Sequence, residues 1–366
     1  MHEQQRFGDP LKHLTLLCCP EVAGEGPGAT VIQSLMMQSE LMKRVCAFNR
    51  GNCAVFTVNN ISRENITIRD LEIDGGLTRE FAKNASSRCG LGNGIVSEPC
   101  PPCTTTDATA TFTQCGWNNF GILLWDYNMP QRKGSDAQSP RNIWLSGLHI
   151  HSCSMGLHVL GTTNITLEDS TLDRNGNGNA YFHNAYFLRV VGATLRNTTF
   201  QGSTGHGLKI TQQNQTLITN CTVADNIWQG IWVGGESKGN WDLRIIDSII
   251  ERNHMYGIQL SDTDGFEVRG CTIRHNPNPS KAGLMLGSRN GLVIDTEITQ
   301  NYNNLVVESG DNVTLNGVTG CSVAFLYPMC GPNKGHGFTV RNTSCKARPL
   351  DSCALPESPF MSAAAH

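Results

Sequence analysis

Charged and aromatic residues are scarce in this sequence of 366 residues. Charged side chains account for 16% and aromatic side chains for 7%, and the formal net charge is −3. This balance gives no general electrostatic attraction to nucleic acids or anionic membranes. Long hydrophobic runs are also missing, since no apolar stretch approaches the roughly 20 residues of a membrane-spanning helix. We therefore expect neither a nucleic acid nor a membrane as a partner, and we expect a monomer.

The N-terminus, Met1-His-Glu-Gln-Gln, shows no signal peptide, and we interpret it as the start of a fragment or a mature form. The 15 cysteines are typical of disulfide bonds in a secreted protein. Nine Asn-x-Ser/Thr sequons are compatible with a glycoprotein, although asparagine in turns and threonine in strands also produce them. We expect a secreted protein and leave its glycosylation open.

A short phrase recurs along most of the chain: one glycine or asparagine, then alternating apolar residues. The step between phrases is mostly 21 to 28 residues, and the first step is 35. A second strand-like phrase, Asn-h-Thr-h with h apolar, begins at Asn65, Asn164 and Asn312. Such a period with turn-forming residues predicts an all-β fold, a right-handed parallel β-helix or β-solenoid. The phrases begin at Gly121, Gly156, Asn184, Gly207, Gly230, Gly257, Gly283 and, more weakly, Asn304.

The period also predicts how the chain is organised. Residues 1–55 are expected to form irregular N-terminal coils, and residues 56–320 the parallel β-helix. A cysteine-containing insertion interrupts the period at 77–117. Residues 321–366, rich in cysteine and proline, are expected to form a C-terminal cap and tail that covers the exposed sheet edge.

Because side chains alternate along a strand, each phrase has inward and outward positions. The inward positions are predicted to stack as a core, formed by Ile122, Leu157, Leu208, Ile231, Ile258 and Leu284. The third position points outward, and we call this set the outward ladder: Leu123, His158, Tyr186, Lys209, Trp232, Gln259, Met285 and Val306. A second column precedes the phrases and contains His183, His206, Gln229 and Tyr256. Successive rungs should lie roughly 4.8 Å apart.

The middle of the outward ladder combines proton-transfer groups with an exposed indole, which favours a binding site for an acidic sugar chain. Trp232 offers a flat face for a sugar ring, and Lys209 can neutralise a uronate carboxylate. Proton removal at C5 needs a base, for which His183 or His206 is suited, and Tyr186 can protonate the leaving oxygen. Further substrate-binding residues are predicted to be His158, Arg189, Tyr256 and Gln259.

These residues predict a polysaccharide lyase that cleaves a uronic-acid-containing polymer by β-elimination. If the proton returns from the opposite face, the same site is a C5-epimerase. A glycoside hydrolase would need a pair of carboxylates, and the outward positions contain none. From a different class, a non-catalytic glycan-binding or adhesin-like solenoid would use the tryptophan without moving a proton.

The Asn-h-Thr-h and Gly-h-x-h coils of residues 56–320 resemble right-handed parallel β-helix proteins of the pectate-lyase-like superfamily. Polysaccharide lyases and mannuronan C5-epimerases of that group use Tyr, His, Lys and Arg on such a face, and the predicted catalytic residues are similar in type. Gly205-His206-Gly207 looks like the Gly-His-Gly motif of polygalacturonases. That family's Asn-Thr-Asp and Asp-Asp motifs are replaced by Asn175-Gly-Asn-Gly-Asn and His183-Asn-Ala-Tyr. The resemblance therefore favours lyase or epimerase chemistry, and glycoside hydrolysis is kept as a further alternative.

Metal sites are weakly indicated. Cys100-Pro-Pro-Cys103, with Cys89 and Cys115 nearby, has donors for zinc, but no histidine lies between residues 77 and 117. Disulfides or free thiols are the favoured interpretation. Some β-helix lyases use calcium, but no cluster of outward aspartates indicates it here. We predict no cofactor and leave calcium open.

Overall fold

The computed structural model describes residues 21–33, 52–59, 64–75, 118–125, 140–176, 182–235, 239–309, 311–320, 323–326, 339–344 and 346–349. The predicted insertion at 77–117, with its four cysteines, lies outside the described residues. The described residues contain no helix with the length and apolar character required to cross a bilayer.

The described strands pair in parallel and form three faces of one solenoid. The first face contains β3 (Asn52–Asn59), β5 (Asn118–Trp125), β7 (Met155–Leu160), β10 (Ala185–Leu188), β13 (Leu208–Thr211), β16 (Ile231–Val233), the first parts of β19 (Ile258–Arg269) and β21 (Ala282–Ile294), β23 (Asn303–Ser309), β25 (Val323–Leu326) and β27 (Lys346–Pro349). The second face contains β1 (Glu21–Ala23), the first parts of β4 (Glu64–Asp74) and β6 (Arg141–His151), β8 (Thr163–Glu168), β11 (Val191–Arg196), β14 (Asn214–Thr219), β17 (Asn240–Ile246), the last parts of β19 and β21, β24 (Val313–Asn316) and β26 (Thr339–Arg341). The third face contains β2 (Val31–Gln33), the last parts of β4 and β6, β9 (Thr171–Asp173), β12 (Thr199–Gln201), β15 (Thr222–Ala224), β18 (Ile249–Glu251), β20 (Thr272–Arg274) and β22 (Glu297–Thr299).

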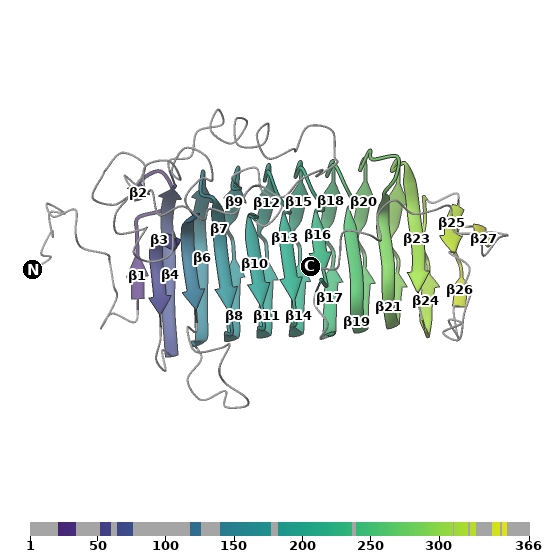
Figure 1. Cartoon of the computed structure of the whole chain (residues 1–366), viewed down its shortest axis with the longest axis horizontal. Helices are drawn as coiled ribbons and strands as arrows, with labels where there is room; N and C mark the ends of the chain where they lie inside the picture. Colours follow the sequence, from purple (N-terminus) through teal and green to yellow (C-terminus); the bar gives the residue numbers. More distant parts are fainter. Residues whose placement is uncertain are drawn as a thin grey trace, which may run out of the picture.

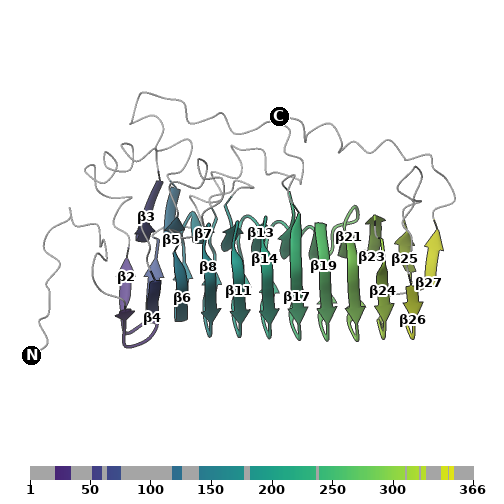
Figure 2. The same ribbon diagram turned by 90° about the horizontal axis from the view of Figure 1, so that it is seen from below.

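The strands follow one another along the long axis, from purple at the N-terminal end to yellow at the C-terminal end (Figure 1). The view turned by 90° shows the same succession (Figure 2). Each coil visits the first, second and third face in turn, as in β7, β8 and β9. This arrangement confirms the predicted all-β parallel β-helix.

The predicted inward residues stack inside the solenoid. Ile122 pairs with Leu157, and further along the same row Leu208 pairs with Ile231 and Ile231 with Ile258. The relative exposure of each of these side chains is 0%. Burying one such side chain stabilises the fold by roughly 1.5–3 kcal/mol, so a row repeated in every coil dominates the stability.

A ladder of buried asparagines lies where the third face leads into the first. Asn226 donates Nδ2 to Asn253 Oδ1 at 2.8 Å, and Asn253 continues to Asn276 Oδ1 at 3.2 Å. The ladder explains the glycine of the repeated phrase, because a Cβ atom at Gly207 would lie 2.6 Å from Asn226 Nδ2. In the phrase that begins with Asn184, this asparagine joins the ladder and donates to Asn226 Oδ1 at 3.2 Å.

Two interior thiols lie near the second face. Cys221 and Cys271 are free and buried, and the Cys221 N–H donates to Ser248 Oγ at 3.1 Å. Burial raises the pKa of Cys221 to about 11 and that of Cys271 to about 12. Protonated, inaccessible thiols of this kind serve packing and not chemistry.

Candidate active site

The outward ladder has the register that the sequence predicts. Tyr186 lies beside His158 on β7 and beside Lys209 on β13. Lys209 in turn pairs with Trp232 on β16, and Trp232 with Gln259 on β19. The first face of the solenoid therefore presents an imidazole, a phenol, an ammonium and an indole on successive rungs.

Ring contacts hold the middle of this ladder in place. The His158 ring stacks on the Tyr186 ring with centroids 5.3 Å apart and an interplanar angle of 13°. Lys209 Nζ lies 3.8 Å from the centroid of the Trp232 ring and 5.5 Å from that of Tyr186. A cation over an indole gains a favourable interaction with the ring quadrupole. The ammonium group is thus positioned between two rings of the ladder.

The second column brings two imidazoles against the ladder. His183 and His206 are both buried, and their ring centroids lie 4.6 Å apart. His183 meets Tyr186 edge-on at 5.7 Å, and His206 meets Trp232 at 4.9 Å. The backbone N–H of His206 donates to His183 Nδ1 at 3.2 Å, so the proton of neutral His183 is assigned to Nε2.

All three histidines are kept neutral. Burial lowers the pKa of His158 from 6.5 to about 4. Burial, followed by the charges of His206 and Lys209, holds the pKa of His183 well below its usual range. Burial and the Lys209 charge also hold the pKa of His206 well below its usual range, whereas the Gln229 side chain raises this pKa. Near neutral pH the site combines neutral imidazoles with the positive charge of Lys209.

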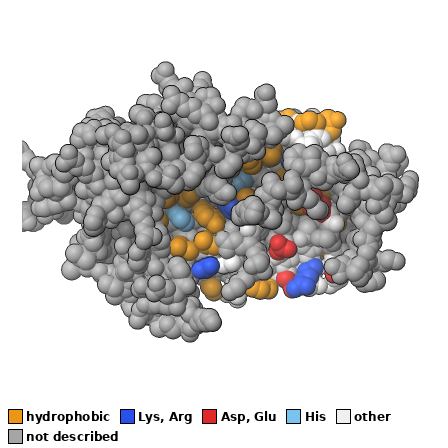
Figure 3. Space-filling view, viewed as in Figure 1, with side chains coloured by type: hydrophobic (Ala, Val, Ile, Leu, Met, Phe, Trp, Pro, Cys, Tyr) orange, Lys and Arg blue, Asp and Glu red, His pale blue; other side chains and the backbone are white. Residues whose placement is uncertain are grey.

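Several buried polar atoms of this site have no hydrogen-bond partner within the described part of the chain. Among the described residues these are both ring nitrogens of His158, Nδ1 of His206, Oε1 of Gln229 and Nε1 of Trp232. Buried polar atoms without partners are costly in a fold, and they are common at sites that receive a polar ligand. Figure 3 shows hydrophobic, histidine and basic side chains gathered in the middle of one face of the molecule.

The other predicted substrate-binding residues are Arg189, Tyr256 and Gln259. Arg189 lies in the turn after β10, with φ of 56°, and donates Nε to Gln212 Oε1 at 2.7 Å. The Tyr256 ring is 5.1 Å from Lys281 Nζ. Gln259 Oε1 accepts a hydrogen bond of 2.7 Å from Gln229 Nε2, which links the second column to the outward ladder.

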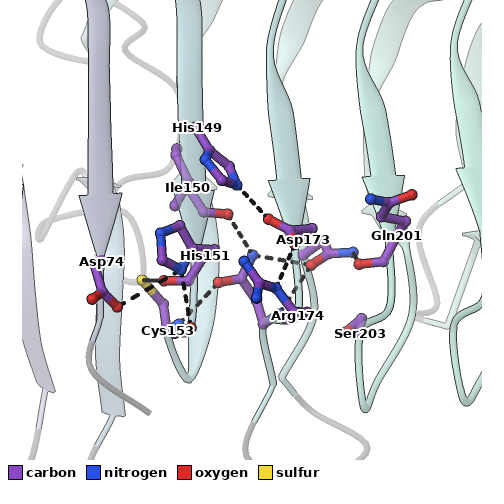
Figure 4. Close-up of polar contacts among 12 residues, drawn as sticks. Asp74, His149, Ile150, His151, Cys153, Asp173, Arg174, Gln201 and Ser203 are labelled. Carbon is purple, nitrogen blue, oxygen red and sulfur yellow. Dashed lines mark hydrogen bonds and ion pairs between the residues drawn. The ribbon is translucent and has the colours of Figure 1, made fainter. Parts of the chain in front are cut away.

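A second cluster of polar residues lies on the third face, and the sequence reasoning missed it. It contains Glu72, His149 and His151, with Asp74 and Asp173 beside them. Figure 4 shows the two histidines between Asp74 and Asp173. The signal was present in the alternation of Leu71-Glu-Ile-Asp74 and Leu148-His-Ile-His151, which places both polar residues of each segment on the outer side. The lack of carboxylates therefore applies to the described outward ladder, whereas the third face carries several.

The fold and the ladder define a class of protein: a parallel β-helix that presents polar and aromatic side chains on one face. A family model described as "Right handed beta helix region" matches residues 186–347. A second model, "Periplasmic copper-binding protein (NosD)", matches residues 103–253. The chain is thus a parallel β-helix protein, and over residues 186–347 it is similar to the right-handed β-helix family model, as the repeated phrases predicted.

Solved structures with this fold include carbohydrate-active enzymes. The A-module of mannuronan C-5 epimerase AlgE4 from Azotobacter vinelandii gives a TM-score of 0.59 at 15% identity, over 90% of this chain and 81% of that one. The AlgE6 A-module from the same organism gives 0.52 at 15% identity, over 90% and 79%. DFA-IIIase from Arthrobacter chlorophenolicus A6, solved without its lid, gives 0.52 at 10% identity, over 80% and 70%. No curated protein matches the chain by sequence.

Proposed function

We propose that the chain is a secreted, monomeric enzyme that acts on a uronic-acid-containing polysaccharide by removing the proton at C5 of a uronate, with β-elimination as the outcome. The observation that carries this proposal is the arrangement of the side chains in the middle of the outward ladder and in the adjoining second column. The charge of Lys209, the phenol of Tyr186 and the neutral imidazole of His206 lie on adjacent rungs. The solved structures of the same fold that are named mannuronan C-5 epimerases act at the same carbon.

Lys209 is suited to hold the substrate carboxylate. Removal of the C5 proton pushes electron density into the carboxylate, and a fixed cation stabilises the enolate-like charge. Trp232, against which the ammonium lies at 3.8 Å, would at the same time offer its ring to the sugar. The binding of the anion should weaken the electrostatic effect of Lys209 on the histidines, which raises their basicity when substrate is present.

His206 is a better base than His183. The lone pair of His183 Nδ1 already accepts the His206 backbone N–H. In His206, Nδ1 has no hydrogen-bond partner among the described residues. A general base must be deprotonated before it can act, and the lowered pKa of His206 keeps it so across the neutral range. We therefore propose His206, and not His183, as the base.

The elimination step balances with residues of the outward ladder and of the second column. The C5–H electron pair forms the C4=C5 double bond, the proton goes to His206, and the C4–O bond breaks. Tyr186, one rung from Lys209, would protonate the leaving oxygen. The products are an unsaturated uronide and a new chain end.

Epimerisation at C5 is the second candidate, because the named activity of two structural neighbours is C-5 epimerisation. It needs the same first step, followed by return of a proton from the opposite face. Incubation with a panel of alginate, pectate, glucuronan and glycosaminoglycans, followed by ultraviolet absorbance, separates the two outcomes. Only elimination creates the absorbing double bond. A protein that binds one of these polymers but alters none of them would be a glycan-binding solenoid instead.

A further inference from the structure

The outer side of the third face carries a cluster that the proposed reaction does not use. Glu72 of β4 lies beside His149 of β6, and Asp74 lies beside His151, which in turn lies beside Asp173 of β9. Three rungs thus bring two imidazoles and three carboxylates to one patch, and His151 is nearly buried. The patch lies on a different face from the outward ladder.

Each histidine of the cluster presents one ring nitrogen to Glu72. His151 Nε2 lies 2.9 Å from Glu72 Oε1, and His149 Nδ1 lies 3.9 Å from Glu72 Oε2. The three donor atoms, one from each side chain, lie within 4.8 Å of one another. The two rings are close together as well, with centroids 4.6 Å apart.

The opposite ring nitrogens have their own partners. His149 Nε2 lies 2.7 Å from Asp173 Oδ1, and Asp173 also accepts a 2.6 Å hydrogen bond from Arg174 Nε. His151 Nδ1 lies 3.0 Å from Ser152 Oγ. Histidines that ligate metals are commonly held in this way, with the second nitrogen bonded to a carboxylate or another oxygen that fixes the ring.

We propose that Glu72, His149 and His151 bind a single divalent transition-metal ion of the zinc type. Two imidazoles and one carboxylate form a known three-ligand set for zinc, which leaves a further position for water or substrate. Zinc bonds of roughly 2.0–2.2 Å place the donors of a tetrahedral site roughly 3.3–3.6 Å apart. The present separations of 2.9 Å, 3.9 Å and at most 4.8 Å would each have to change by roughly 1.5 Å or less. Calcium and magnesium prefer sets of oxygen ligands, so the two imidazoles select against them.

The alternative explanation is that the cluster binds no metal ion. The same side chains would then form only a network of polar contacts between the imidazoles and the carboxylates. The geometry favours the metal because both imidazoles converge on one carboxylate, whereas a network of polar contacts alone has no need to do so. The two explanations differ in what happens when metal is supplied and when one ligand is removed.

The test uses the full chain, freed of metal with a chelator and then titrated with Zn²⁺ by calorimetry and equilibrium dialysis. One equivalent should bind, and Co²⁺ in its place should give the visible spectrum of a low-coordinate site. His149→Ala, His151→Ala and Glu72→Gln should each weaken binding by more than about 100-fold. Asp173→Asn should weaken it by about 10–100-fold, since that residue only orients His149. His254→Ala, which removes an exposed histidine outside the cluster, should bind as the wild type does.

Two results would overturn the proposal. One is a wild-type chain that takes up no Zn²⁺. The other is Zn²⁺ retained at wild-type affinity in the His149→Ala and His151→Ala variants, which would assign the ion to other groups such as the cysteines of 77–117. Glu72→Gln keeps the size of the side chain, so circular dichroism of this variant separates loss of the ligand from loss of the fold.

Discussion

Acidification should destabilise this solenoid through His158. Burial lowers the pKa of this imidazole from 6.5 to about 4, so the folded chain keeps it neutral where the unfolded chain protonates it. Its contribution is fully present above about pH 6.5 and is lost as the pH falls from there toward 4. At about 1.4 kcal/mol per pKa unit, the difference of about 2.5 amounts to about 3 kcal/mol, of which about 2 kcal/mol is lost by about pH 5.

The assay is urea unfolding of wild type and His158→Phe at about pH 7.5 and about pH 5. Phenylalanine can fill the space between the rings of Phe120 and Tyr186 without titrating. The decrease in the free energy of unfolding between the two pH values should be about 2 kcal/mol smaller in the variant. His254→Ala removes an exposed histidine and should behave as wild type. An equal decrease in wild type and His158→Phe would refute the reasoning.

Other consequences follow from the fold and the site. Asn253→Ala removes buried hydrogen bonds to Val223 O and Asn276 Oδ1, so the free energy of unfolding should fall by about 2–4 kcal/mol. An unchanged urea midpoint would contradict the stabilising role of the asparagine ladder. Lys209→Met should raise the pKa of His206 in an NMR titration, because the ammonium charge helps to lower it; a lower or equal value would contradict this. Trp232→Ala should weaken polymer binding by roughly 1–3 kcal/mol, and an unchanged KM would place the indole outside the binding site.

The parts of the fold that repeat could be predicted from the sequence. One glycine or asparagine per coil sets the register, and a constant register places Tyr186 beside Lys209 and Lys209 beside Trp232. The period does not explain why the glycine is needed. The reason is crowding by the asparagine ladder and by the backbone of the next coil, because a Cβ atom at Gly230 would lie 2.6 Å from both Asn253 Nδ2 and Gly257 O.

Side-chain contacts within the candidate site were harder to predict. Sequence spacing put His183 and His206 in one column, but the hydrogen bond between the His206 amide and His183 Nδ1 depends on side-chain rotamers. The cluster of the third face was missed because its members are far apart in sequence. Glu72 and His151 are separated by 79 positions, and the interruption at 77–117 hides their equivalent places in successive coils.

The central claim is removal of the C5 proton, and release of deuterium from a uronate polymer labelled at C5 measures it directly. The account predicts that wild type releases the label into water from at least one polymer of the panel, whether elimination or epimerisation follows. His206→Gln should release it on the order of 10²-fold more slowly. Glutamine is tolerated at this position of the column, since the next coil carries Gln229 there. The account would be contradicted if the wild type released label from none of these polymers. It would also be contradicted if His206→Gln released the label as fast as the wild type.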